Sequence, residues 1–252
     1  MKLRAFITAL ALLTASCTNN TKQLQTSVAL RPLDTLAVSI VSAPIYPELF
    51  QTAFIKGSKA RINESELTLY GVNIGSLKVP SGKIVACDPM HIDEYGIPFT
   101  QVFPTGEFPV HLAIARLEQE EMIAFACIQF SKLPVARWEF ALQAGQEPLT
   151  FGGKKKHGYS VDAGVGMFID EQNVKLLNPL DVTETDRGIY TALDSNARNS
   201  WRYAMYHFGG TNAATFSTGF GDGRYASYIG FDANGSVCQL LTDFELFNWK
   251  KR

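Results

Sequence analysis

The feature that most constrains the fold of this chain is a series of short apolar segments, each ended by turn-forming residues. In RWEFAL, residues 137–142, bulky apolar residues alternate with Arg137 and Glu139, as they do in a half-buried strand. The segments 109–117 and 122–130 flank the charged turn EQEE, which predicts a hairpin. The segments 67–79 and 83–88 flank Pro-Ser-Gly, and this trio predicts another hairpin.

The C-terminal part continues this strand pattern. Segments 213–218, 224–231 and 236–244 are expected strands, and residues 225–244 are expected to form a hairpin that turns at DANG, residues 232–235. Helical signals are few: residues 170–177, with Asp170 as the cap, and residues 184–199. The sequence therefore predicts an α+β fold that is mostly antiparallel β, either sandwich-like or a hairpin-rich sheet with a few short helices.

The N-terminus has the order of a secretion signal. Lys2 and Arg4 precede an apolar run, AFITALALLTA, which is too short to span a bilayer as a stable helix. The run ends in LTASC, which resembles the lipobox of bacterial lipoproteins, and the resemblance implies that Cys17 carries the lipid. The resemblance also implies the outer membrane of a diderm host, because Thr18 stands where an aspartate would retain the protein at the inner membrane. A plain secreted protein is the alternative.

These signals divide the chain into a signal peptide at 1–16, a flexible polar tether at 17–35 and one β-rich domain at 36–249. The remaining cysteines, Cys87, Cys127 and Cys238, lie in apolar segments. Buried free thiols are expected, and one disulfide is the alternative. The formal net charge of −1 argues against a nucleic-acid-binding role, which needs a basic surface.

Several familiar sites are excluded by their spacing. The Gly-Lys pair at 82–83 lacks the spacing of a phosphate-binding loop, and the four histidines share no metal-ligand spacing. There is no H-E-x-x-H, and TFSTG lacks the first glycine of a nucleophile elbow. No cofactor is therefore required by the sequence, although a divalent cation remains an alternative.

Aspartates beside glycines are the candidate site residues. Asp162 and Asp222 each lie where a strand runs into a glycine-rich turn, and Arg224 and Tyr225 follow Asp222 directly. We expect these four residues to bind a ligand, with Asp162 and Asp222 close together. A turn-capping role is the alternative for Asp162. Asp232 is expected only to shape its hairpin turn, because asparagine and glycine follow it in DANG.

Four motifs carry a family resemblance. They are LKVPSGKIVACDP, PFTQVFPTGEFPVHLAIA, YSVDAGVGMFID and GFGDGRYASYIGFDANGSVCQLLTDF, and they follow one another between residues 67 and 247. Together they resemble the bacterial family DUF4241, a domain of unknown function. Phe220, Met167 and Met90 depart from its usual residues by apolar exchanges. The resemblance implies one coherent domain and no particular reaction.

Three functions are compatible with these observations. The first is a lipid-anchored cell-envelope protein whose β domain binds a protein or a small molecule. The second is a hydrolase with an acidic, metal-dependent or metal-free centre formed by Asp88, Asp162 and Asp222. The third is a structural envelope protein. The partners expected from the sequence are the membrane, through Cys17, and an unknown ligand, and nucleic acid is not expected.

Overall fold

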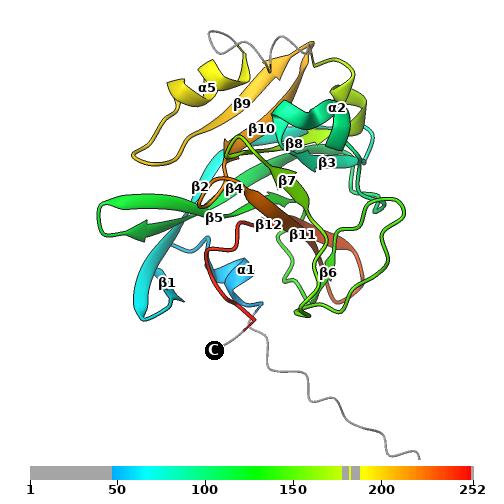
Figure 1. The fold of residues 1–252 in the computed structure, drawn as a ribbon. Coiled ribbons are helices and arrows are strands. Elements are labelled where there is room, and N and C mark those ends of the chain that lie inside the picture. The colour runs from blue at the N-terminus through cyan, green and yellow to red at the C-terminus, as the bar shows by residue number, and fades with distance from the viewer. Residues whose placement is uncertain (1–46, 178–181, 183–187, 251–252) are drawn as a thin grey trace, which may run out of the picture. The chain divides into compact units, whose positions relative to one another are not determined.

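The larger of two antiparallel sheets is built around the hairpin that the sequence predicts at 109–130. The computed structural model describes residues 47–177, 182 and 188–250, all within one compact unit, Ser42–Arg252. The expected signal peptide, tether and lipidated Cys17 lie outside the described residues. In sheet order the strands are β1 (Ser58–Ile62), β2 (Ser65–Val79), β4 (Gly106–Leu117), β5 (Glu120–Gln129), β12 (Val237–Asp243), β11 (Gly223–Phe231) and β6 (Arg137–Phe140), and β7 (Tyr159–Val161) also pairs with β11 (Figure 1).

The second sheet has four strands. Their order is β3 (Ile84–Cys87), β8 (Val165–Asp170), β10 (Thr211–Ser217) and β9 (Tyr203–Phe208). The described helical segments are short: α1 (Leu49–Thr52), η1 (Pro89–His91), α2 (Ile92–Tyr95), α3 (Glu171–Val174) and α5 (Ile189–Ser195). The predicted class, mostly antiparallel β with a few short helices, is confirmed. None of the helices described is long and apolar enough to cross a membrane.

Two hairpins form as predicted, because their register is set locally. β4 and β5 pair antiparallel across a two-residue turn, and β11 pairs with β12. The second turn is shaped by Asp232, whose Oδ1 accepts hydrogen bonds from the backbone N–H groups of Asn234 and Ser236, both at 2.8 Å. Gly235 takes the positive φ of this turn, at 82°.

The hairpin predicted for 67–79 and 83–88 is wrong. β2 pairs with β1 and β4 in the large sheet, whereas β3 pairs with β8 in the second sheet. The intervening turn carries the chain between the sheets, because the Ser81 N–H and hydroxyl both donate to the carboxylate of Asp170 on β8, at 2.9 and 2.8 Å. Asp170 also caps α3 as expected by accepting from the Gln172 N–H, although α3 ends at Val174 rather than at 177.

The helix expected at 184–199 is shorter in the structure, where α5 spans Ile189–Ser195. Residues 184–187 lie outside the described residues. The Asn196 side chain donates to the carbonyl of Ala192 just beyond the last turn, and the chain then leaves the helix for β9. Cys87, Cys127 and Cys238 are buried free thiols, and burial raises the pKa of each.

A buried carboxylate joins the β4–β5 hairpin to the loop before β9. Glu121 accepts from the Arg116 guanidinium at 3.0 Å, from the Tyr70 hydroxyl at 2.9 Å and from the Trp201 indole N–H at 3.1 Å. Burial opposes ionisation of Glu121, but these hydrogen bonds outweigh it and lower its pKa. The polar contacts therefore fix the loop that leads into the second sheet.

Candidate functional site

Asp88 lies at the end of β3, and its carboxylate is completely buried. One oxygen accepts the Met90 N–H at 2.8 Å, and the other accepts the N–H groups of Asp162 and Ala163 at 2.9 and 3.0 Å. A buried carboxylate needs such partners because it has left water. Asp88 therefore fixes the turn after β7 against η1, and its oxygen atoms are occupied by the backbone.

Asp222 ties the turn after β10 to the turn after β7. Its Oδ1 accepts the Gly164 N–H at 3.1 Å. A Cβ at Gly164 would lie 3.6 Å from the Gly221 Cα, and both glycines have positive φ. The turns that contain Asp162 and Asp222 are therefore in contact, and Asp88 also binds the first of them.

The Asp162 carboxylate points to solvent. It is 69% exposed and lies 3.3 Å from Nε2 of His91. The His91 ring in turn lies beside the ring of Tyr95, with centroids 5.8 Å apart. An exposed contact of this kind contributes little to stability. Asp162 is therefore available to a partner, unlike Asp88.

Phe220 is the most exposed large apolar side chain of this region, at 68%. The turn that carries it is held by the Thr218 hydroxyl, which donates to the Gly221 carbonyl at 2.7 Å. Gly219 has φ of 40°, and a Cβ there would lie 2.7 Å from the Leu246 side chain, so the turn is packed tightly on the domain. The turn therefore holds Phe220 in its exposed position.

These turns form one surface, which we call the three-turn face. Its members at the surface are the half-buried His91 and the exposed Tyr95, Asp162, Phe220 and Asp222. The structure thus brings together the turns of all three predicted aspartates, Asp88, Asp162 and Asp222, with Asp88 buried beneath.

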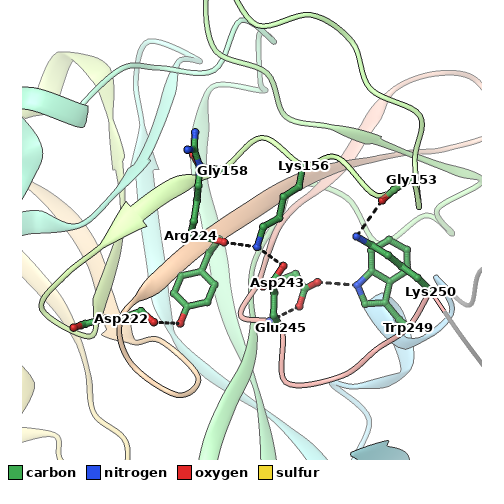
Figure 2. A network of polar contacts seen from close by, with 10 residues as sticks. Gly153, Lys156, Gly158, Asp222, Arg224, Asp243, Glu245, Trp249 and Lys250 are labelled. Carbon is green, nitrogen blue, oxygen red and sulfur yellow. Dashed lines mark hydrogen bonds and ion pairs between the residues drawn. The ribbon is translucent and has the colours of Figure 1, made fainter.

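Arg224 and Tyr225, the other two predicted ligand-binding residues, hold β7 to β11, and Figure 2 shows Arg224 beside Gly158 and Lys156. The Arg224 Nε donates to the Gly158 carbonyl at 3.1 Å, and its own carbonyl accepts from Lys156 at 2.8 Å. Tyr225 is buried edge-on against Phe244, and its hydroxyl donates to the Gly221 carbonyl at 2.7 Å. Burial raises the pKa of Tyr225. Its polar end therefore supports the Phe220 turn from inside.

A second polar cluster, which the sequence does not predict, lies at the C-terminal end of β12 (Figure 2). Asp243 is buried, and its two oxygens accept from the Trp249 indole N–H at 2.7 Å and from the Glu245 N–H at 2.8 Å. Burial raises the pKa of Asp243 from its ordinary value of 3.8 to about 6. No local signal distinguishes this aspartate, because its burial depends on Trp249 folding back over it.

In the part of the chain that the structure describes, no set of three or more His, Cys, Asp or Glu side chains is arranged to hold a metal ion. The arrangement on the three-turn face offers hydrogen-bond acceptors, an imidazole and exposed rings.

Comparison with known families agrees with the motifs. A family model described as a protein of unknown function, DUF4241, matches residues 77–242. No curated protein and no solved structure matches the chain.

Proposed function

The chain belongs to the DUF4241 family of proteins of unknown function, and from the geometry of its surface we propose that it is a membrane-tethered binding protein of the cell envelope that captures a protein partner on the three-turn face. One observation carries this proposal. Two aspartates, Asp88 and Asp222, lock the turns together by hydrogen bonds to backbone N–H groups, so that Phe220 is presented to solvent from a fixed position.

A fixed aromatic side chain suits binding of a protein. Aromatic residues are enriched at the centres of protein interfaces, and a preorganised side chain loses little entropy when the partner arrives. Tyr95 adds a second exposed ring, and Met90 is also exposed. Phe220 would enter an apolar pocket of the partner, with the other two at the rim.

The charge of the face indicates the chemistry of that partner. The three turns, residues 88–97, 159–166 and 218–223, contain no Lys or Arg. Asp93, Glu94, Asp162 and Asp222 are exposed on them. A partner surface that bears Lys or Arg around an apolar pocket would complement this face and associate faster.

The cellular location of the protein is part of the proposal. The charged start, the apolar run and LTASC support lipidation of Cys17, and a polar tether would follow it. The domain would then meet its partner at the membrane surface, in the outer membrane if the host is diderm.

Photo-crosslinking at position 220 tests the proposal. Phe220 is replaced by p-benzoylphenylalanine in the full chain, and living cells are irradiated. We expect one discrete adduct in the membrane fraction, which is lost when Asp93→Lys and Asp162→Lys are added, because these changes invert the charge of the face and leave the hydrogen bond of Asp222 to Gly164 in place.

The matched control carries the photoreactive residue at Ile55, which is 61% exposed and follows α1. This position is expected to give no discrete adduct. The same adduct from both positions, no adduct from position 220, or an adduct that survives the charge reversal would each overturn the proposal.

A further inference from the structure

A groove of about 450 Å³ lies on the large sheet beside α1. Its floor comes from three neighbouring strands: His111 on β4, Cys127 and Gln129 on β5, and Gln239 on β12. In the register of the sheet His111 is opposite Cys127 and Gln239 is opposite Gln129, so all four side chains share one face. Figure 1 shows these strands side by side. The volume is within the range of small-ligand sites.

Two atoms of this floor are buried without a hydrogen-bond partner. They are Nε2 of His111 and Oε1 of Gln239. Folded proteins rarely leave such atoms unpaired, because the lost hydration is not replaced. An apolar side chain at either position would fold without this cost. Polar side chains with unused hydrogen-bonding atoms in a groove therefore point to a ligand that supplies the missing partners.

The walls of the groove are preformed. On one side the Phe54 segment rests on Gly71 of β2, where a Cβ would lie 2.4 Å from the Phe54 carbonyl oxygen. On the other side Val135 rests on Gly230 of β11, where a Cβ would lie 2.9 Å from the Val135 side chain. Backbone hydrogen bonds tie both ends of this second wall to the sheet, from Phe130 to Cys238 and from Ala136 to Phe231. The walls would thus stay in place while the side chains of His111 and Gln239 turn toward a ligand.

We propose that this groove binds a small uncharged molecule rich in hydroxyl groups, such as a sugar ring. A hydroxyl can donate to the unpaired oxygen of Gln239 and can donate to or accept from the imidazole of His111. The amides of Gln51 and Gln129 offer further donors and acceptors at the same groove. The inference is independent of the partner proposed for the three-turn face.

Charge and shape both favour this class of ligand. The floor residues carry no charged side chain that could compensate a buried ligand charge, and the Lys132 side chain is exposed at the rim. Burial lowers the pKa of His111 and favours the neutral imidazole, although a hydrogen bond that the ring donates to Gln129 raises it. Phe54, Leu133 and Pro134 supply apolar surface for the C–H faces of a ring.

Binding of neutral sugars to the purified full chain tests the inference. The probes are glucose, galactose, N-acetylglucosamine, maltose and trehalose, each measured by saturation-transfer NMR and by titration of the thermal midpoint. We expect at least one of them to bind, and Gln239→Met to weaken that binding at least tenfold. The same variant without ligand should be as stable as the wild type or more stable, because it removes an unpaired buried oxygen.

Two further variants make the result specific. His111→Leu removes the other unpaired atom from a different strand and should weaken the same sugar. Gln119→Met, in the exposed turn between β4 and β5, makes the same chemical change outside the groove and should leave binding unchanged. Absence of binding by every sugar, binding that survives both groove variants, or an equal loss in the Gln119 control would overturn the inference. Binding of dipeptides in place of sugars would also overturn it.

Discussion

At the scale of single residues, the buried Asp88 and Asp232 differ in the backbone N–H groups that their carboxylates bind. Asp88 uses both oxygens for three backbone N–H groups that belong to two separate turns. Asp232 uses one oxygen, Oδ1, for two N–H groups within its own turn. Asparagine retains one carbonyl oxygen and replaces the other with an NH₂ group, which cannot accept.

Asp88→Asn and Asp232→Asn should therefore have unequal effects. Asp88→Asn turns an NH₂ group toward backbone donors and loses charge-assisted hydrogen bonds, so we expect a loss of about 2 to 3 kcal/mol of unfolding free energy. Asp232→Asn keeps the oxygen that the turn uses and should change stability by less than about 0.5 kcal/mol. Urea denaturation of both variants measures this difference. Equal losses would contradict the assignment of Asp88 as the anchor between turns.

The candidate site could be predicted from the sequence at this scale only in part. Asp162 and Asp222 stand out because glycines flank them, and their turns do meet. Arg224 and Tyr225 follow in sequence, yet the alternation of β11 and the burial of the tyrosine ring assign them to the pairing with β7. Sequence proximity shows that residues share a segment, but it does not show which of them the fold leaves exposed.

At the scale of elements, Asp243 ties the C-terminal segment to the start of the domain. It holds Trp249 by the indole N–H, and the Trp249 ring packs on Phe50 of α1, with centroids 4.7 Å apart, and on Phe151 at 5.2 Å. Neither α1 nor the segment after β12 has enough hydrogen bonds of its own to be stable alone. Their mutual packing therefore depends on this buried carboxyl group.

The raised pKa of Asp243 predicts a pH-dependent stability. Because its pKa rises from 3.8 to about 6 on folding, the folded state holds the proton more tightly than the unfolded state. The stabilising contribution is fully present below about pH 4 and is lost as the pH rises through 6, a change of about 3 kcal/mol at 1.36 kcal/mol for each pKa unit. Asp243→Asn removes this titration, so the stability of the variant relative to the wild type should rise between pH 4 and pH 7. Urea unfolding of both proteins across that range measures it, and a constant difference would contradict the prediction.

The elements that the sequence predicts well are those with local register. The β4–β5 and β11–β12 hairpins need only a short turn and two apolar segments. The split between β2 and β3 was missed, because strands of either sheet carry similar apolar patterns and the deciding contact, Ser81 with Asp170, spans a long stretch of chain. The groove beside α1 was missed for the same reason, since His111, Gln129 and Gln239 meet only through the register of three strands.

At the scale of the whole molecule, the two proposed binding regions are built from different parts of the domain. The three-turn face is formed by turns that follow β3, β7 and β10, whereas the groove lies on β4, β5 and β12. Substitutions in one region leave the contacts of the other intact. The two proposals can therefore be tested separately in the same protein.

The proposed membrane attachment concerns the whole chain, and Cys17→Ser tests it. The short basic start, the apolar run and the small residues before Cys17 predict cleavage at this cysteine and its acylation. More than one acyl chain on a single residue gives stable anchoring, whereas one chain gives only marginal binding. Cys17→Ser should leave either unprocessed precursor or a domain released into the soluble fraction, and Thr18→Ser should leave processing and attachment unchanged.

Cell fractionation with labelled palmitate measures processing and attachment in both variants. Unchanged processing and membrane association of Cys17→Ser would show that the chain is not a lipoprotein, and release of Thr18→Ser to the same extent would show that the effect is not specific to the thiol.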